Sequence, residues 1–278
     1  VVTLNRNNVT PGIAPMLDGS VGILVSNSTA TAATTPMVVA TVAGSNSFNR
    51  FYSNTIQNSN IGIGLSGFVA GAPYTLADIG NDIGGTALST GNIVKNFGGG
   101  VSTSDTAAGI LTAAQYDLNI AYNTINSNDG AGVTHNNAIR GIYNKAAAGA
   151  NANITNNTVT VLTAIPNVTV NANTRLTAIE NDGGSGGTSN TINISNNTIT
   201  NCLFNYAPAS STTTNGMFGI LNTASPSKLV VKQNVFSASS TNSVVANGQT
   251  SMIYNRGAVR DSLTIDGNNF TSLNLTAT

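Results

Sequence analysis

The chain has 278 residues, of which 40% are hydrophobic and only 7% are charged, and its ten basic and ten acidic residues leave no net charge. This composition excludes charge-driven disorder, which combines low hydrophobicity with high net charge, and it excludes a global field that attracts nucleic acid or anionic lipid. The 42 Asn and 29 Gly weaken helices and favour turns, so the composition predicts an all-β fold. Because no run of about 18 apolar residues occurs, we expect no membrane insertion. Because the charges cancel, we expect no nucleic-acid partner.

An Asn-centred unit recurs along the chain, with an apolar residue three positions before the Asn and another two positions after it. The alternation of apolar residues slips phase just before the Asn, as where a strand turns a corner, and Asn suits a corner because it tolerates left-handed backbone angles. Only the copy at Asn92 lacks the leading apolar residue. A further apolar residue, five positions before the Asn, predicts a half-buried strand in the copies that carry Val2, Leu118, Ile192, Leu229 and Leu263. The eight repeated Asn residues are Asn7, Asn54, Asn92, Asn123, Asn157, Asn197, Asn234 and Asn268.

A second element, usually Gly or Ala followed by Ile, occurs once between each consecutive pair of these Asn residues. In four copies another Asn follows the Ile by two positions, at Asn144, Asn181, Asn222 and Asn255, which predicts a second strand with its own corner. The Ile residues are Ile23, Ile63, Ile110, Ile142, Ile179, Ile220 and Ile253.

Stacking of such units predicts a right-handed parallel β-helix, because each unit is too short to bury its own apolar face. The chain is then a single segment of about eight coils over residues 1–278, with an Asn ladder and a core Ile column, and both ends fall inside the repeat, as in a fragment of a longer repeat protein. Variable loops are expected at 26–35, 98–108, 182–189 and 207–215. A β-propeller is the alternative, but the chain has no Trp and only 5% aromatic residues.

The runs NTINSN, ITNNTVTV and ISNNTITNC, with the Gly-Ile-x-Asn element between them, resemble the parallel β-helix repeats of large bacterial surface proteins, especially those that Bacteroidetes export by the type IX system. The resemblance covers almost the whole chain. It implies a secreted protein displayed on the bacterial cell surface as a filament or adhesin. The same repeats also occur in stalk proteins and in polysaccharide-degrading enzymes, so the resemblance is more specific for fold than for function.

The ionisable residues do not form a recognisable catalytic pattern. The closest acid pairs are Asp78 with Asp82, Glu180 with Asp182, and Asp261 with Asp266. Glu180 follows a core Ile and is expected to point outward, whereas Asp182 opens the flexible loop DGGSGG, which lacks the alternate Asp residues of a calcium site. The only histidine, His135, is expected to be a solvated loop residue, and Cys202 a buried, inert thiol. We therefore predict no catalytic, cofactor-binding or metal site.

The leading functional hypothesis is a non-catalytic, extracellular structural or adhesive rod, whose partners are neighbouring repeats, copies of the same protein or surface glycans. The alternative is a carbohydrate-binding or polysaccharide-degrading module similar to pectate lyases, with Asp182 or Arg175 in the site. Aligned coils would then give a basic stripe for an acidic sugar, formed by Arg140, Arg175, Arg256 and Arg260. Ice or mineral binding is a third hypothesis, since Thr follows four of the repeated Asn residues directly.

Two tripeptides resemble the O-glycosylation acceptor of secreted Bacteroidetes proteins. They are Asp105-Thr106-Ala107 and Asp261-Ser262-Leu263, which would place sugar on Thr106 and Ser262. An intact mass equal to that of the bare polypeptide would contradict this expectation.

Overall fold

The computed structural model describes residues 2–3, 20–29, 32–98, 107–127, 135, 138–145, 147–163, 175–204, 216–243 and 249–277. Within these ranges nearly all regular structure is strand, and the one helical element is the short 3-10 helix η1 (Val42–Gly44). The prediction of an all-β fold is confirmed.

Three long sheets run through the molecule. The post-Asn sheet follows the repeated Asn and contains, in order, β1 (Val2–Thr3), β6 (Thr55–Gln57), β10 (Ile93–Lys95), β14 (Thr124–Asn126), β17 (Thr158–Thr160), β21 (Thr198–Thr200), β25 (Val235–Ser237) and β29 (Asn269–Thr271). The pre-Asn sheet contains β5 (Arg50–Phe51), β9 (Asp82–Ile83), β13 (Leu118–Ala121), β16 (Ala152–Thr155), β20 (Thr191–Ser195), β24 (Lys228–Lys232) and β28 (Ser262–Asp266). The Gly-Ile sheet contains β2 (Val21–Ser26), β7 (Ile61–Ser66), β11 (Ala107–Ala113), β15 (Ile139–Lys145), β19 (Arg175–Asn181), β23 (Gly216–Asn222) and β27 (Gln249–Asn255).

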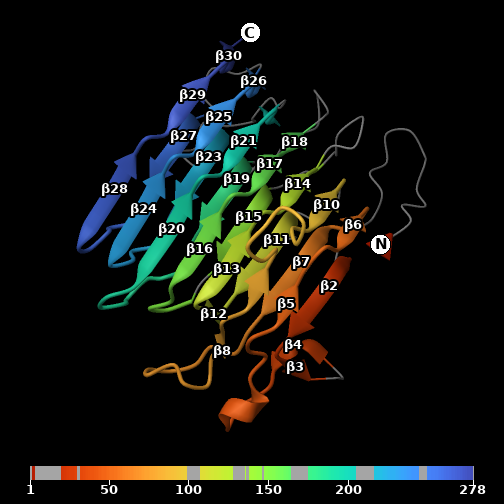
Figure 1. Cartoon of the computed structure of the whole chain (residues 1–278), viewed down its shortest axis with the longest axis vertical. Helices are drawn as coiled ribbons and strands as arrows, with labels where there is room; N and C mark the ends of the chain where they lie inside the picture. The colour runs from red at the N-terminus through yellow and green to blue at the C-terminus, as the bar shows by residue number, and fades with distance from the viewer. Residues whose placement is uncertain are drawn as a thin grey trace.

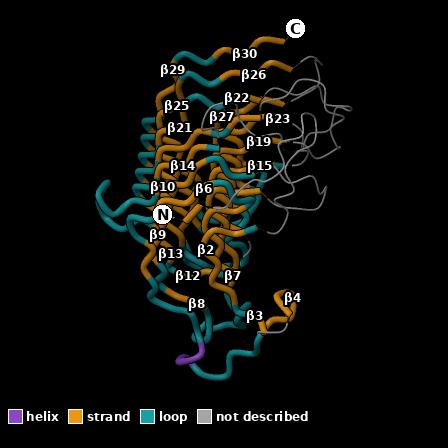
Figure 2. Tube along the Cα trace, turned by 90° about the vertical axis from the view of Figure 1, so that its right-hand side faces the viewer, coloured by secondary structure: helices purple, strands orange, loops and turns teal. Residues whose placement is uncertain are grey.

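Each coil contributes one strand to each long sheet, and neighbouring strands within these sheets pair in parallel. In one coil, for example, the chain passes from β15 to β16, through Asn157 to β17, and then on to β19 in the next coil. Figure 1 shows the strands of successive coils side by side along the long axis, and Figure 2 shows the same stack from the side. The chain is therefore a parallel β-solenoid, and the propeller alternative is wrong because propeller blades are built from antiparallel strands.

Shorter sheets lie beside this stack. Four parallel strands follow the post-Asn sheet in the later coils, β18 (Leu162–Thr163), β22 (Leu203–Phe204), β26 (Ser240–Ser243) and β30 (Asn274–Ala277). β8 (Asp78–Ile79) pairs in parallel with β12 (Gln115–Tyr116). β3 (Ser28–Thr29) and β4 (Ala32–Pro36) pair antiparallel, so a hairpin lies within the stretch that the sequence predicts as a plain loop.

The core is a column of apolar side chains from all three long sheets. In the Gly-Ile sheet the seven Ile residues are in direct register, each paired with the Ile of the neighbouring coil from Ile23 to Ile253. Ile63, Ile110, Ile142 and Ile179 are fully buried. Identical branched side chains thus pack on one another from coil to coil.

The Gly before the Ile lets the Gly-Ile sheet approach the post-Asn sheet. A Cβ at Gly141 would lie 2.4 Å from Cγ1 of Val159 and 2.5 Å from the carbonyl oxygen of Ala178. The same close approach holds at Gly62 and Gly109, where the nearest side chain again belongs to the post-Asn strand. The small residue of the repeat is therefore required by packing between the two sheets rather than by a turn.

Two copies of the repeat differ in register from the sequence-based expectation. Val2 pairs with Ile56 in the post-Asn sheet, whereas the sequence places it in the strand that leads to an Asn. The copy at Asn92 does have a leading apolar residue, because Ile83 pairs with Ile120 in the pre-Asn sheet and an insertion at 84–91 separates it from the Asn. The apparent defect in the repeat is an insertion at the corner.

The left-handed corner residue is the one before the repeated Asn, and not that Asn itself. Positive φ angles occur at Ser53, Tyr122, Asn156, Asn196, Gln233 and Gly267, each of which directly precedes a ladder Asn. The expectation that the repeated Asn itself takes the left-handed conformation is wrong, because the side chain of this Asn forms hydrogen bonds between coils, as described below.

Candidate functional site

The Asn ladder is a column of side chains that runs from Asn54 to Asn268. The backbone N–H and Nδ2 of Asn157 both donate to Oδ1 of Asn197, each at 3.0 Å. Nδ2 of Asn157 also donates to the carbonyl of Ile120 at 2.9 Å, and its Oδ1 accepts from the N–H and Nδ2 of Asn123, each at 3.0 Å. An Asn side chain offers two donors and two acceptor lone pairs, so the bonding capacity of Asn157 is filled.

The same bonding pattern repeats in the neighbouring coils, at Asn92, Asn123, Asn197 and Asn234. The side chains of the ladder in its central coils are at most 1% exposed. A buried amide is tolerated only when its polar atoms are paired, so the ladder is a satisfied polar column inside the apolar core. Asn7, the remaining member predicted from the sequence, lies outside the described residues.

A second ladder ends the strands of the Gly-Ile sheet. Nδ2 of Asn144 donates to Oδ1 of Asn181, Asn181 donates in the same way to Asn222, and Asn222 to Asn255, each at 2.7 Å. Thr112 begins this column and donates to Oδ1 of Asn144 at 3.2 Å. The Asn residues that follow the Ile therefore do occupy a second corner, as the sequence predicts.

Asp78 is a buried carboxyl group surrounded by amides. Its Oδ1 accepts from the N–H of Asn46 at 3.0 Å and from Nδ2 of Asn27 at 3.2 Å, and its Oδ2 lies 3.5 Å from Nε2 of Gln115. Burial raises the pKa of Asp78, and these hydrogen bonds offset only part of the shift. Asp78 and Asp82 therefore do not act as a pair, since Asp78 belongs to the interior.

Glu180, which the sequence predicts to point outward because it follows a core Ile, is buried. It is 2% exposed, and its carboxylate accepts from Nε of Arg140 at 2.5 Å and from Arg175. Arg140 also lies over the ring of Tyr143, 4.2 Å from the centroid. Burial lowers the pKa of Arg175 and raises the pKa of Tyr143. The expected basic stripe is thus reduced to an internal ion-pair cluster on the Gly-Ile sheet, and it does not include Arg256 or Arg260, which follow β27.

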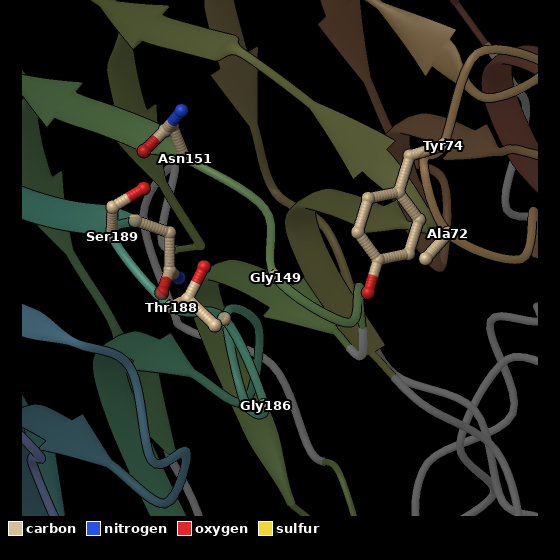
Figure 3. A pocket seen from close by; sticks show the side chains of 9 residues that line it. Ala72, Tyr74, Gly149, Asn151, Gly186, Thr188 and Ser189 are labelled. Carbon is tan, nitrogen blue, oxygen red and sulfur yellow. The ribbon is translucent and has the colours of Figure 1, made fainter.

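The first surface hollow, the loop hollow, lies between three turns that leave the Gly-Ile sheet. It has a volume of about 390 Å³. Tyr74 forms one wall, and its ring stacks on Tyr116 with centroids 5.1 Å apart. Figure 3 shows Tyr74 facing Thr188, Ser189 and Asn151 across the hollow. The complete lining is Ala72, Tyr74, Gly149, Asn151, Gly186, Gly187, Thr188, Ser189 and Asn190.

The second surface hollow, the sheet hollow, lies on the outer face of the pre-Asn sheet and has a volume of about 500 Å³. Its floor is formed by Asp82, Asn119 and Asn153, which are in register in adjacent strands. Oδ1 of Asp82 accepts from Nδ2 of Asn119 at 2.7 Å and from the N–H of Gly85 at 3.0 Å, and Oδ2 accepts from the hydroxyl of Tyr52 at 2.5 Å. This hydrogen bond raises the pKa of Tyr52.

Asp117 also lines the sheet hollow, so two carboxylates from adjacent coils share it. The sequence does not pair Asp82 with Asp117, because only the stacking register brings them to one surface. In that register Asp82 pairs with Asn119 and not with Asp117, so no repeated acid position in the sequence marks the two carboxylates as neighbours.

Other predicted sites are placed as follows. His135 is fully buried, so it is not the solvated residue that the sequence predicts. Cys202 is buried as expected, and burial raises its pKa to about 11. Ser262 is exposed at the first position of β28, where an O-linked sugar has access, whereas Thr106 lies outside the described residues.

The Thr residues after the ladder form a column of only three neighbours on the outer face of the post-Asn sheet. Thr124, Thr158 and Thr198 are in register, and Ile93 and Val235 occupy the flanking positions. The regular array required for ice or mineral binding is therefore interrupted on both sides.

No group of three or more His, Cys, Asp or Glu side chains is placed as metal ligands among the described residues. In the same part of the chain, no helix has the length and apolar character to cross a membrane.

Together, the three parallel sheets and the two amide columns define the chain as a parallel β-solenoid with asparagine ladders. Comparison with protein-family models, with curated proteins and with solved structures finds no match.

Proposed function

We propose that the chain is a non-catalytic, structural and adhesive rod of an extracellular bacterial surface protein. The observation that carries the proposal is the continuous Asn ladder, in which each central side-chain amide is buried and filled with hydrogen bonds. These polar side chains are committed to holding one coil to the next rather than to a ligand. Display on the cell surface and type IX secretion rest on the resemblance of the repeat runs.

The ladder supports a structural role because it makes each coil depend on both neighbours. Replacing Asn157 with Ala removes the Oδ1 that accepts two hydrogen bonds from Asn123. It also removes the Nδ2 that donates to the carbonyl of Ile120 and to Oδ1 of Asn197. We expect Asn157→Ala to lower the free energy of unfolding by about 2–4 kcal/mol, since buried polar groups lose their partners. Thermal unfolding and resistance to a broad-specificity protease at 37 °C measure this loss.

Asn153→Ala is the matched control, because Asn153 lies in the same coil but is exposed, and accepts one bond of 3.3 Å from Asn193. The wild type and Asn153→Ala should resist digestion, whereas Asn157→Ala should be cut. Equal stability of the two variants would refute the structural role of the ladder, and rapid digestion of the wild type would contradict an extracellular rod.

A polysaccharide-degrading enzyme is the second candidate, because Asp82 and Asp117 line one hollow. Glycoside hydrolysis requires one carboxyl group that donates a proton. The carboxylate of Asp82 instead accepts three hydrogen bonds from Tyr52, Gly85 and Asn119, so both of its oxygens are engaged within the protein rather than directed at a glycosidic bond. Release of new reducing or unsaturated sugar ends by the wild type, lost in Asp82→Asn, would favour the enzyme over the rod.

A further inference from the structure

We propose that the loop hollow and the sheet hollow form one groove that binds an uncharged polysaccharide chain. This inference deepens the adhesive part of the proposed function, because it names the ligand class and the surface. It uses the outer face of the pre-Asn sheet and the adjoining turns, and not the Arg140, Arg175 and Glu180 cluster of the Gly-Ile sheet.

The two hollows adjoin through a single hydrogen bond. Asn151 lines the loop hollow, and its Nδ2 donates at 2.9 Å to Oδ1 of Asp117, which lines the sheet hollow. Oδ1 of Asn151 in turn accepts from the N–H of Thr191 at 2.8 Å, so this junction is fixed to β20. Each volume falls within the range of about 300–1,000 Å³ that is usual for small-molecule sites. A ligand that fills both hollows is therefore an extended chain of several units.

The lining selects a ligand that is neutral and rich in hydroxyl groups. No Lys or Arg lines either hollow, and the two acids of the sheet hollow disfavour an anionic chain. Carboxylate oxygens accept hydrogen bonds from sugar hydroxyls, and side-chain amides both accept and donate them. The ring of Tyr74 offers an apolar face for a sugar ring. Asp82 is already held by Tyr52, Asn119 and Gly85, which favours recognition by hydrogen bonds over capture of a cation.

The loop hollow is held in shape before any ligand arrives. A small apolar cluster of Ala70, Ala77, Tyr116, Ala147 and Ala150 anchors the turn that carries Tyr74. The backbone at Gly149 has a φ of +67°, and a Cβ there would lie 3.1 Å from the Tyr74 ring, so glycine admits the ring at this position. Groups that are fixed in advance lose less conformational entropy on binding.

The test is a glycan array that carries neutral oligosaccharides, such as β-glucan, xylan, mannan and galactan fragments, beside acidic ones, such as oligogalacturonides. Binding to a neutral hit is then measured by calorimetry with the wild type and with Tyr74→Ala, Tyr74→Phe and Asn153→Ala. Tyr74→Ala and Asn153→Ala should each weaken binding by about tenfold, and Tyr74→Phe by less, because it keeps the ring. Thr124→Ala, an exposed change on the post-Asn sheet, is the control and should leave the affinity unchanged.

Several results would overturn the groove. They are no binding to any neutral oligosaccharide, neutral binding that neither Tyr74→Ala nor Asn153→Ala weakens, a preference for the acidic oligosaccharides, and loss of binding when EDTA is added. A folded Asn153→Ala variant that binds less tightly would support the groove whatever the fate of Tyr74→Ala. The ladder experiment is independent, because it reads stability, so the rod and the groove can fail separately.

Discussion

At the scale of single residues, Asn has two different uses at one corner. Asn156 takes the left-handed conformation, with a φ of +57°, while the next residue, Asn157, turns its amide into the ladder. The sequence predicts the ladder because every copy of the unit has an Asn at the position of Asn157. It does not separate the two uses, since Asn occupies both positions here and at Asn196 and Asn197. Only the other copies, where Ser53 or Tyr122 bears the positive φ, show which position is the turn.

The raised pKa of Asp78 makes a prediction about pH. Because the folded-state pKa lies above the ordinary value, the native state binds a proton more readily than the unfolded chain between these two values. The contribution of Asp78 to stability therefore falls as pH rises through that window. Asp78→Asn cannot ionise, so its stability relative to the wild type should increase from about pH 3.5 to about pH 7.5. Urea unfolding at both pH values measures the difference, and a difference that does not change with pH would contradict it.

At the scale of elements, the sequence predicts where the strands lie. It does not show why particular residues are needed within them. The Gly-Ile pattern indicates a strand in every coil, but the need for Gly becomes visible only when Gly141 is placed against Val159 of another sheet. In the same way, Ile83 is hidden from the repeat by the insertion at 84–91, and only its pairing with Ile120 identifies it. Spacing along one chain reports what is close in sequence, whereas these contacts join segments from different sheets and coils.

The close approach of the two sheets predicts the effect of one added methyl group. Gly141→Ala should lower the free energy of unfolding by about 1–3 kcal/mol, because its Cβ would overlap Val159 and the carbonyl of Ala178. Gly71→Ala is the matched control, since a Cβ at Gly71 meets no atom within 4 Å, and it should stay within about 0.5 kcal/mol of the wild type. Chemical denaturation of both variants compares them. Similar stabilities would show that the sheets do not need glycine at this contact.

At the scale of the whole molecule, the parallel stacking of the coils could be predicted from the sequence. The set of outward side chains that meet on the surface could not. Asp82 and Asp117 are far apart in the chain and reach one hollow because β9 and β13 are neighbours. The interval between ladder residues varies between 31 and 40 residues within the structure, so the exact alignment of outward side chains depends on loops. The core columns tolerate this variation, since each strand is placed by its own Ile or Asn.

Removal of one complete coil tests the modular character of the stack. Deletion of residues 158–197 spans one ladder interval and joins Asn157 to Thr198, which replaces Thr158 at an equivalent position. We expect a folded protein with cooperative unfolding and somewhat lower stability, because stability in a solenoid is the sum of coil and interface contributions. Deletion of residues 158–187 breaks this phase and should not fold. Circular dichroism and thermal unfolding distinguish the two, and equal behaviour of both deletions would argue against interchangeable coils.

The amide columns also give the molecule a direction. Because a backbone N–H can only donate, the bond from Asn157 to Asn197 fixes Oδ1 of Asn197 as the acceptor, and every bond between two ladder amides therefore runs from a donor in one coil to an acceptor in the next. The second column, from Asn144 to Asn255, has the same sense. A two-fold symmetric dimer joined through either end face would oppose donor to donor or acceptor to acceptor. Any association that continues these columns must therefore be heterologous and vectorial, with one end always meeting the other.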